Sequence, residues 1–231
     1  MLGQCLARKQ NLNKGFTVMK IDFGLFDDTT QGTEIHLMSA DEFTGWLAKA
    51  SNAQQAWITA QGFAAKAGKA ITFAGVDGRI DFAIGIYGDH AVWEGASIAA
   101  NLPVGKWKFV IKESPMHNQL AESLALGWGL GQYRFHTYRA TLPAPINCLA
   151  IPTGVQARRL LSQIRGIYLC RDLINQPPNH MTPAALETAM VTLAKTYNAK
   201  LKTHSGKTLE SDFPAIHTVG RSAEIAPRLM D

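Results

Sequence analysis

Cysteine is scarce in this sequence, and long apolar runs are missing from it. The three cysteines, Cys5, Cys148 and Cys170, lie far apart and form no C-x-x-C pair. This argues against a disulfide framework or a cysteine-based zinc site, and it favours a reducing cytoplasm. No stretch approaches the roughly 18 consecutive apolar residues of a membrane span, and residues 1–20 contain no apolar signal-peptide core. We therefore expect a cytoplasmic globular protein with no membrane partner.

The sequence also lacks the motifs of common catalytic and metal sites. It contains no H-E-x-x-H, H-x-H or G-x-S-x-G, and Cys170 falls within a helical apolar pattern, so no nucleophile is predicted. Two pairs of adjacent carboxylates occur, at 27–28 and 41–42. Neighbours in sequence point apart, or they stand at a helix start, where the helix dipole explains their negative charge without a catalytic role. The seven histidines do not cluster, and each is interpreted as a surface or structural residue: His36, His90, His117, His136, His180, His204 and His217.

The net charge of +5 raises the alternative of a nucleic-acid-binding protein. The 23 lysines and arginines are scattered, however, with short clusters only at Lys106/Lys108/Lys112 and Arg158/Arg159. A solvated surface explains these clusters equally well. We expect no nucleic-acid partner.

Strand and helix patterns alternate along the chain, which favours a layered α/β domain. Residues 39–42 form a capping box that predicts a helix start, and strands are expected at 70–73, 80–87, 106–112 and 146–151. In residues 80–87 the large apolar residues fall at every second position, so one face should be buried and the other lined by small or polar residues. Between residues 106 and 112, three apolar residues alternate with lysines, which predicts one face in the core and a basic face in water.

A second domain is expected to begin near residue 152, after a region rich in proline and glycine. The apolar spacing after Val155 predicts a long helix that ends before Pro177–Pro178, and Thr182–Pro183 predicts the start of another. The buried face of that helix should contain Leu186, Met190, Leu193 and Tyr197. A strand is expected at 199–203, partly helical structure at 213–219 and the approach to a strand at 227–231. The predicted organisation is a loose extension (1–18), a first domain (19–151) and a second (152–231).

The glycine-rich stretch Gly127–Gly131 invites comparison with phosphate-binding loops. It lacks both the strand-then-helix context and the spacing of the nucleotide-binding fingerprints. A phosphate site is therefore not predicted.

The most informative segment is Arg171–Pro183, with the sequence RDLINQPPNHMTP. It combines a helix end, a proline pair that forbids continuation, turn-favouring asparagines and a Thr-Pro helix start. A rigid connector between two helices explains it without any function.

This segment resembles the R-D-L-x-N-x-P-x-N-x-x-x-P signature of the leucyl aminopeptidase family. Phe213–Arg221 and Pro227–Leu229 are similar to the family's F-P-A-I-x-x-V-G-R and P-R-L elements, and Leu124–Gly127 with Tyr133–Phe135 looks like its L-G-x-Y-x-F stretch. The resemblance is detailed over residues 120–231, while residues 20–119 share only the order of elements.

The resemblance implies a macro-like α/β amino-terminal domain followed by the incomplete start of an α/β catalytic domain. It also implies a cytoplasmic homo-hexamer that removes amino-terminal residues from peptides through water bridging two divalent cations, Zn or Mn. The family's metal ligands lie in V-G-K-G-x-x-F-D-S-G-G and N-T-D-A-E-G-R motifs, which this sequence does not contain. No catalytic, cofactor-binding or metal residue is carried over, no cation is expected to bind this chain, and we expect a truncated, inactive chain. The open alternative is a non-catalytic binding or assembly module.

Overall fold

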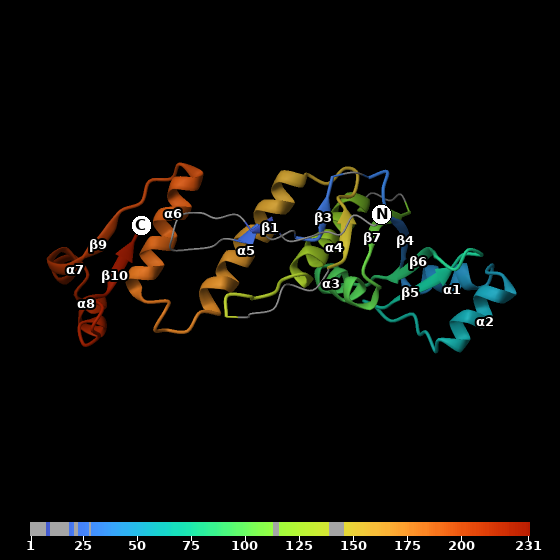
Figure 1. The fold of residues 1–231 in the computed structure, drawn as a ribbon, viewed down its shortest axis with the longest axis horizontal. Helices are drawn as coiled ribbons and strands as arrows, with labels where there is room; N and C mark the ends of the chain where they lie inside the picture. Colours follow the sequence, from blue (N-terminus) through green and yellow to red (C-terminus); the bar gives the residue numbers. More distant parts are fainter. Residues whose placement is uncertain (1–7, 10–18, 21–22, 28, 113–115, 139–145) are drawn as a thin grey trace. The chain divides into compact units, whose positions relative to one another are not determined.

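The computed structural model describes residues 8–9, 19–20, 23–27, 29–112, 116–138 and 146–231 (Figure 1). Its elements fall into two compact units, residues 1–168 and 169–231. The expected extension at residues 1–18 lies outside the described residues, except for the short strand β1 (Arg8–Lys9), which pairs with β2 (Met19–Lys20).

A six-stranded sheet forms the centre of the first unit. Its strands are β3 (Leu25–Phe26), β4 (Thr33–Met38), β5 (Ala70–Ala74), β6 (Ile80–Ile86), β7 (Lys106–Ile111) and β8 (Cys148–Ala150). Their order is β3-β8-β7-β4-β6-β5, and all neighbours are parallel except β5, which runs antiparallel to β6 at the edge. The predicted α/β class is confirmed.

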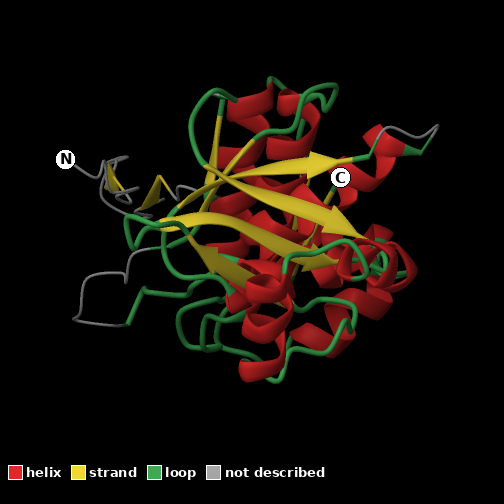
Figure 2. Ribbon diagram, turned by 90° about the vertical axis from the view of Figure 1, so that its right-hand side faces the viewer, coloured by secondary structure: helices red, strands yellow, loops and turns green. Residues whose placement is uncertain are grey.

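Helices cover both faces of this sheet, as Figure 2 shows. On one face, α1 (Ala40–Leu47) and α2 (Asn52–Ala60) contribute Phe43 and Ile58 to an apolar cluster with β5 and β6. On the other face, α3 (Ala91–Asn101), α4 (His117–Gly131) and the first part of α5 (Ala157–Ile174) build the larger core around Leu124, Trp128 and Ile164. The first unit is thus a three-layer structure.

Strand β6 corrects one prediction made from the sequence. Ala83, Ile84, Gly85 and Ile86 are all buried, so both faces of the strand are covered rather than one. Ile84 and Ile86 pack under α1 and α2, while the small residues on the opposite face admit α3: a side chain at Gly85 would lie 3.3 Å from Ile98. The alternation of large and small residues therefore reflects the space on each side, not exposure to solvent.

Strand β7 agrees with the sequence prediction. Trp107 is buried in the larger core, and the lysines point to the other face, where the Lys108 Nζ lies 3.1 Å from a carboxylate oxygen of Glu34. The basic face of β7 is therefore balanced by an acidic side chain on the neighbouring strand.

The outer edge of the sheet, at β5, is covered by a side chain from α2. The indole N–H of Trp57 donates to the carbonyl oxygen of Thr72 at 2.9 Å. This hydrogen bond occupies an acceptor that an edge strand would otherwise present to solvent.

The second unit contains α6 (Pro183–Tyr197), β9 (Thr203–Ser205), α7 (Gly206–Asp212), α8 (Pro214–Gly220) and β10 (Arg228–Met230). Strands β9 and β10 pair antiparallel. The strand expected at 199–203 begins only at Thr203, because α6 ends in a left-handed turn at Asn198 (φ 52°) that the chain must leave first. The predicted burial of Tyr197 is also wrong, since this side chain is 59% exposed.

Two cysteines lie in the described part of the chain. Cys170 is free and exposed, and Cys148 is disulfide-bonded. The sequence expectation of no disulfide therefore fails at Cys148. Among the described helices, none combines the length and the apolar content that a membrane crossing requires.

Candidate functional site

The carboxyl ends of the parallel strands meet at one edge of the sheet. The chain runs from β4 outward to β6 and then returns through α3 to β7, on the other side of β4. In open α/β sheets, ligands commonly bind where the strand order reverses in this way. This edge is therefore the first place to look for a functional site in the first unit.

Glu42 and Tyr87 form the clearest polar contact at this edge. One carboxylate oxygen of Glu42 accepts from the backbone N–H of Ser39 at 2.8 Å and from the Tyr87 hydroxyl at 3.0 Å. The Ser39 N–H is the main reason why the pKa of Glu42 is lowered, while burial, followed by the bond to Glu42, raises the pKa of Tyr87. The Ser39 hydroxyl in turn accepts from the Glu42 N–H at 3.2 Å, so the predicted capping box is confirmed.

A second carboxylate at the same edge, that of Glu94, is 6% exposed. Its two oxygens accept from the backbone N–H groups of Gly88 at 2.7 Å and His90 at 3.0 Å. Both carboxylates are therefore engaged in holding loops and helix starts, a structural role.

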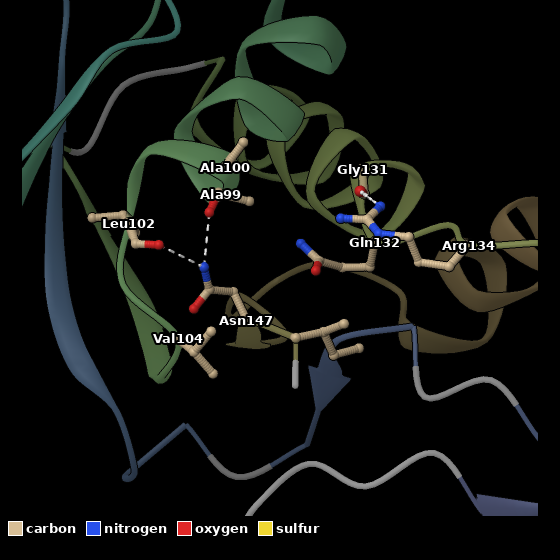
Figure 3. A pocket seen from close by; sticks show the side chains of 9 residues that line it. Ala99, Ala100, Leu102, Val104, Gly131, Gln132, Arg134 and Asn147 are labelled. Carbon is tan, nitrogen blue, oxygen red and sulfur yellow. Dashed lines mark hydrogen bonds between the residues drawn. The ribbon is translucent and has the colours of Figure 1, made fainter. Parts of the chain in front are cut away.

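The opposite edge of the sheet contains a cavity of about 250 Å³ (Figure 3). It lies where α3 and α4 end and where β7 and β8 begin. Its lining is largely aliphatic, with Gln132, Arg134 and Asn147 as the polar members: Ala99, Ala100, Leu102, Val104, Gly131, Gln132, Arg134, Ile146 and Asn147.

Asn147 is the polar centre of this edge. Its amide N–H groups donate to the carbonyl oxygens of Ala99 at 2.8 Å and Leu102 at 3.0 Å, which end α3. Its side-chain oxygen accepts from the Gly105 N–H at 2.8 Å and from the Trp107 indole at 3.1 Å. Sequence reasoning missed this residue, although a lone amide within the apolar run 146–151 was a usable signal.

The glycines of Gly127–Gly131 serve helix packing. They lie in the last turns of α4, and a Cβ on Gly127 would overlap the carbonyl oxygen of Val92 in α3. Likewise, a Cβ on Gly95 in α3 would overlap the carbonyl oxygen of Leu124. These contacts account for the glycines without a phosphate.

The segment Arg171–Pro183 forms the expected connector between α5 and α6. The backbone N–H groups of His180 and Met181 both donate to the Pro177 carbonyl oxygen at 2.9 Å. These bonds close a turn that starts at the first proline of the pair. The Thr182 hydroxyl then accepts from the Ala185 N–H at 3.2 Å at the start of α6. The helix end, turn and Thr-Pro helix start are confirmed.

The histidines do not converge. Three of them each contact a different carboxylate, at 3.3, 3.6 and 3.9 Å: His36 with Glu34, His204 with Asp231 and His217 with Glu210. Within the described ranges, no group of three or more His, Cys, Asp and Glu side chains is placed to hold a metal ion. The described residues thus do not bring a set of metal ligands together.

Comparison with known proteins identifies relatives for both units. Residues 33–152 match the N-terminal domain of M17 aminopeptidases, and residues 168–231 match the catalytic domain of the cytosol aminopeptidase family. The chain is 32% identical over 124 residues to a probable cytosol aminopeptidase of Geobacter sp. (strain M21), an alignment that covers 47% of this chain and 25% of that protein.

Solved structures share the fold. The crystal structure of cytosol aminopeptidase from Coxiella burnetii matches 90% of this chain and 45% of its own, with a TM-score of 0.78 and 29% identity. The bottromycin maturation enzyme BotP in complex with Mn matches 86% of this chain and 44% of its own, with a TM-score of 0.65 and 21% identity. The chain thus spans about half the length of the solved structures it matches.

The N-terminal match alone covers more than half of the sequence, and the confirmed connector lies within the catalytic-domain match. The chain belongs to the M17 family of cytosol aminopeptidases.

Proposed function

We propose that this chain supplies the N-terminal domain and the first elements of the catalytic domain of a metal-dependent leucyl aminopeptidase. The reaction is hydrolysis of the first peptide bond of a peptide substrate. The observation that carries the proposal is the Arg171–Pro183 connector, which combines the family signature with the predicted helix–turn–helix geometry and lies within the match to the family's catalytic domain.

Two divalent cations, Zn or Mn, would lower the pKa of a bridging water, hold the free amine and polarise the scissile carbonyl. The described residues do not offer a cluster to bind them, and the sequence lacks the two family motifs that contain the ligands. We therefore propose that no residue of this chain is catalytic, and we derive no step through a metal here.

The proposed contribution of the chain is positional. Thr182 and Pro183 fix where α6 begins, and the ion pair between Arg228 and Glu187, at 2.6 Å, ties β10 to α6. Both partners of this pair are less than one third exposed, so the contact is partly shielded from solvent. These elements would hold the first strands of the catalytic domain in place, so that the metal-binding residues of the whole protein can be positioned on them. We also propose a cytoplasmic location and a homo-hexamer for the whole protein.

The first test is an assay of the purified 231-residue chain with leucyl chromogenic substrates and added manganese or zinc. We expect no metal-dependent turnover, because the ligand cage is absent. A second test takes the longer reading frame: if the coding sequence continues into both metal motifs, its product should hydrolyse the same substrates with a metal requirement.

Metal-dependent turnover by the 231-residue chain would refute its proposed inactivity. A stop codon directly after Asp231 would instead favour the non-catalytic module. The two outcomes are distinguishable, because turnover is measured on the purified 231-residue polypeptide and the stop codon is read from the gene.

A further inference from the structure

The cavity at the edge of the sheet where β7 and β8 begin has a polar side chain, that of Gln132, in its wall. Gln132 is 7% exposed, and its side chain points into the cavity toward Asn147 (Figure 3). Figure 3 draws the Gln132 amide apart from the hydrogen bonds that Asn147 and Arg134 make. Since the residue lines the cavity and its amide atoms are accessible there, a molecule inside the cavity can bond with them.

Asn147 does not serve as the bonding partner of the Gln132 amide. All four of its side-chain hydrogen bonds are made to α3, Gly105 and Trp107. The Gln132 amide can therefore donate to, or accept from, a molecule in the cavity without competing with the Asn147 network.

Arg134 is the charged residue of the lining. Its two hydrogen bonds to described residues, to the carbonyl oxygens of Gly131 at 3.0 Å and Tyr133 at 2.7 Å, both use Nη1. The Nε and Nη2 groups remain able to donate, and the guanidinium supplies a positive charge beside an amide donor. A carboxylate is the ligand group that this pair of donors suits best.

Gly24 packs closely against two residues of the lining, Gln132 and Asn147. It adopts a left-handed conformation (φ 67°), and a Cβ there would lie 2.9 Å from the Gln132 side chain and would overlap the Asn147 carbonyl oxygen. The remaining wall, from Leu102, Val104 and Ile146, is aliphatic. The cavity thus combines a polar end with an apolar end.

We propose that this cavity binds a small aliphatic carboxylate, with its charged group at Gln132 and Arg134 and its hydrocarbon part against Leu102, Val104 and Ile146. The site lies wholly within the first unit and is independent of the proposed peptidase activity. Its volume limits the ligand to a short molecule.

Ligand-observed saturation-transfer NMR on the full chain tests this proposal with 4-methylpentanoate and its uncharged amide. We expect a saturable signal from the carboxylate and at least a tenfold weaker affinity for the amide. Arg134→Gln and Gln132→Leu should each weaken binding of the carboxylate at least tenfold. Arg158→Gln removes an equal charge from an exposed position of α5 and should leave binding unchanged.

Circular dichroism on each variant separates loss of the site from loss of the fold. Equal signals from carboxylate and amide, or equal effects of Arg134→Gln and Arg158→Gln, would overturn the charged site. The absence of any saturable signal would show that the cavity contains water only and would overturn the proposal entirely.

Discussion

Asn147 is a single residue whose side-chain hydrogen bonds connect several elements of the first unit. Asn147 joins the end of α3 to the starts of β7 and β8 through four side-chain bonds. Leucine at this position has a similar volume but removes the Asn147 bonds to two carbonyl oxygens and to the Gly105 N–H, and it leaves the Trp107 indole only its longer bond to the Pro103 carbonyl oxygen, at 3.3 Å. We expect Asn147→Leu to lower the free energy of unfolding by about 3 kcal/mol or more.

Urea denaturation followed by tryptophan fluorescence measures this loss. Asn101→Leu is the matched control, since Asn101 is exposed and makes a single bond within α3, and its effect should stay within about 0.5 kcal/mol. Similar losses for the two variants would mean that the Asn147 network contributes little.

The Glu42 capping box gives a prediction about acid stability. Because the folded state lowers the pKa of Glu42 below 4.5, its stabilisation is present above pH 4.5 and is lost as the pH falls through the folded pKa. Glu42→Gln should therefore be less stable than the parent at pH 7, and the difference should shrink on acidification. Denaturation curves at several pH values test this, and a constant difference would contradict it.

Tyr87 gives the opposite pH dependence. Its pKa is raised above 10.0, so its stabilisation is present below pH 10.0 and is lost as the pH rises through the folded pKa. Tyr87→Phe should remove this alkaline loss, because no phenol remains to ionise. Denaturation between pH 9 and pH 12 measures it.

At the scale of elements, the crossing of α3 and α4 depends on glycines at the contact. Gly127→Ala places a methyl group on the Val92 carbonyl oxygen, and we expect a loss on the order of 2 kcal/mol. Gly166→Ala is the matched control: this exposed glycine of α5 has open space around it. There alanine should stabilise the chain by up to about 1 kcal/mol.

Thermal unfolding of both variants distinguishes packing from helix propensity. If Gly127→Ala lowered the stability no more than Gly166→Ala does, this result would contradict the close contact between α3 and α4 at Gly127.

The sequence predicted most elements because their signals are local. The capping box at Ser39, the Thr182–Pro183 helix start and the alternation in β7 each depend on neighbours within a few residues. Errors arose where distant packing decides the outcome. The covered second face of β6 depends on α3, and the role of Asn147 depends on three separate elements.

At the scale of the whole molecule, the second unit has little core and much exposed apolar surface. Leu209 is fully buried, but Ile174, Tyr197 and Val219 are 81%, 59% and 84% exposed. We expect the chain to self-associate at micromolar concentration, because such surface is normally covered. Sedimentation velocity measures this.

The double variant Ile174→Glu/Val219→Lys should shift the chain toward monomer. Val76→Lys, in an exposed turn of the first unit, should not. A monodisperse monomer with a sharp, cooperative melt would contradict the expectation.

The indole that covers β5 has a consequence for how copies of the protein meet. A strand arriving from another molecule would find the Thr72 carbonyl oxygen already occupied by Trp57, and it would have to displace a bulky ring before its own amide could bond there. Continuous intermolecular ladders, the first step toward fibrils, are thus disfavoured along this border. Backbone pairing between subunits at β5 would therefore first require the indole to leave Thr72.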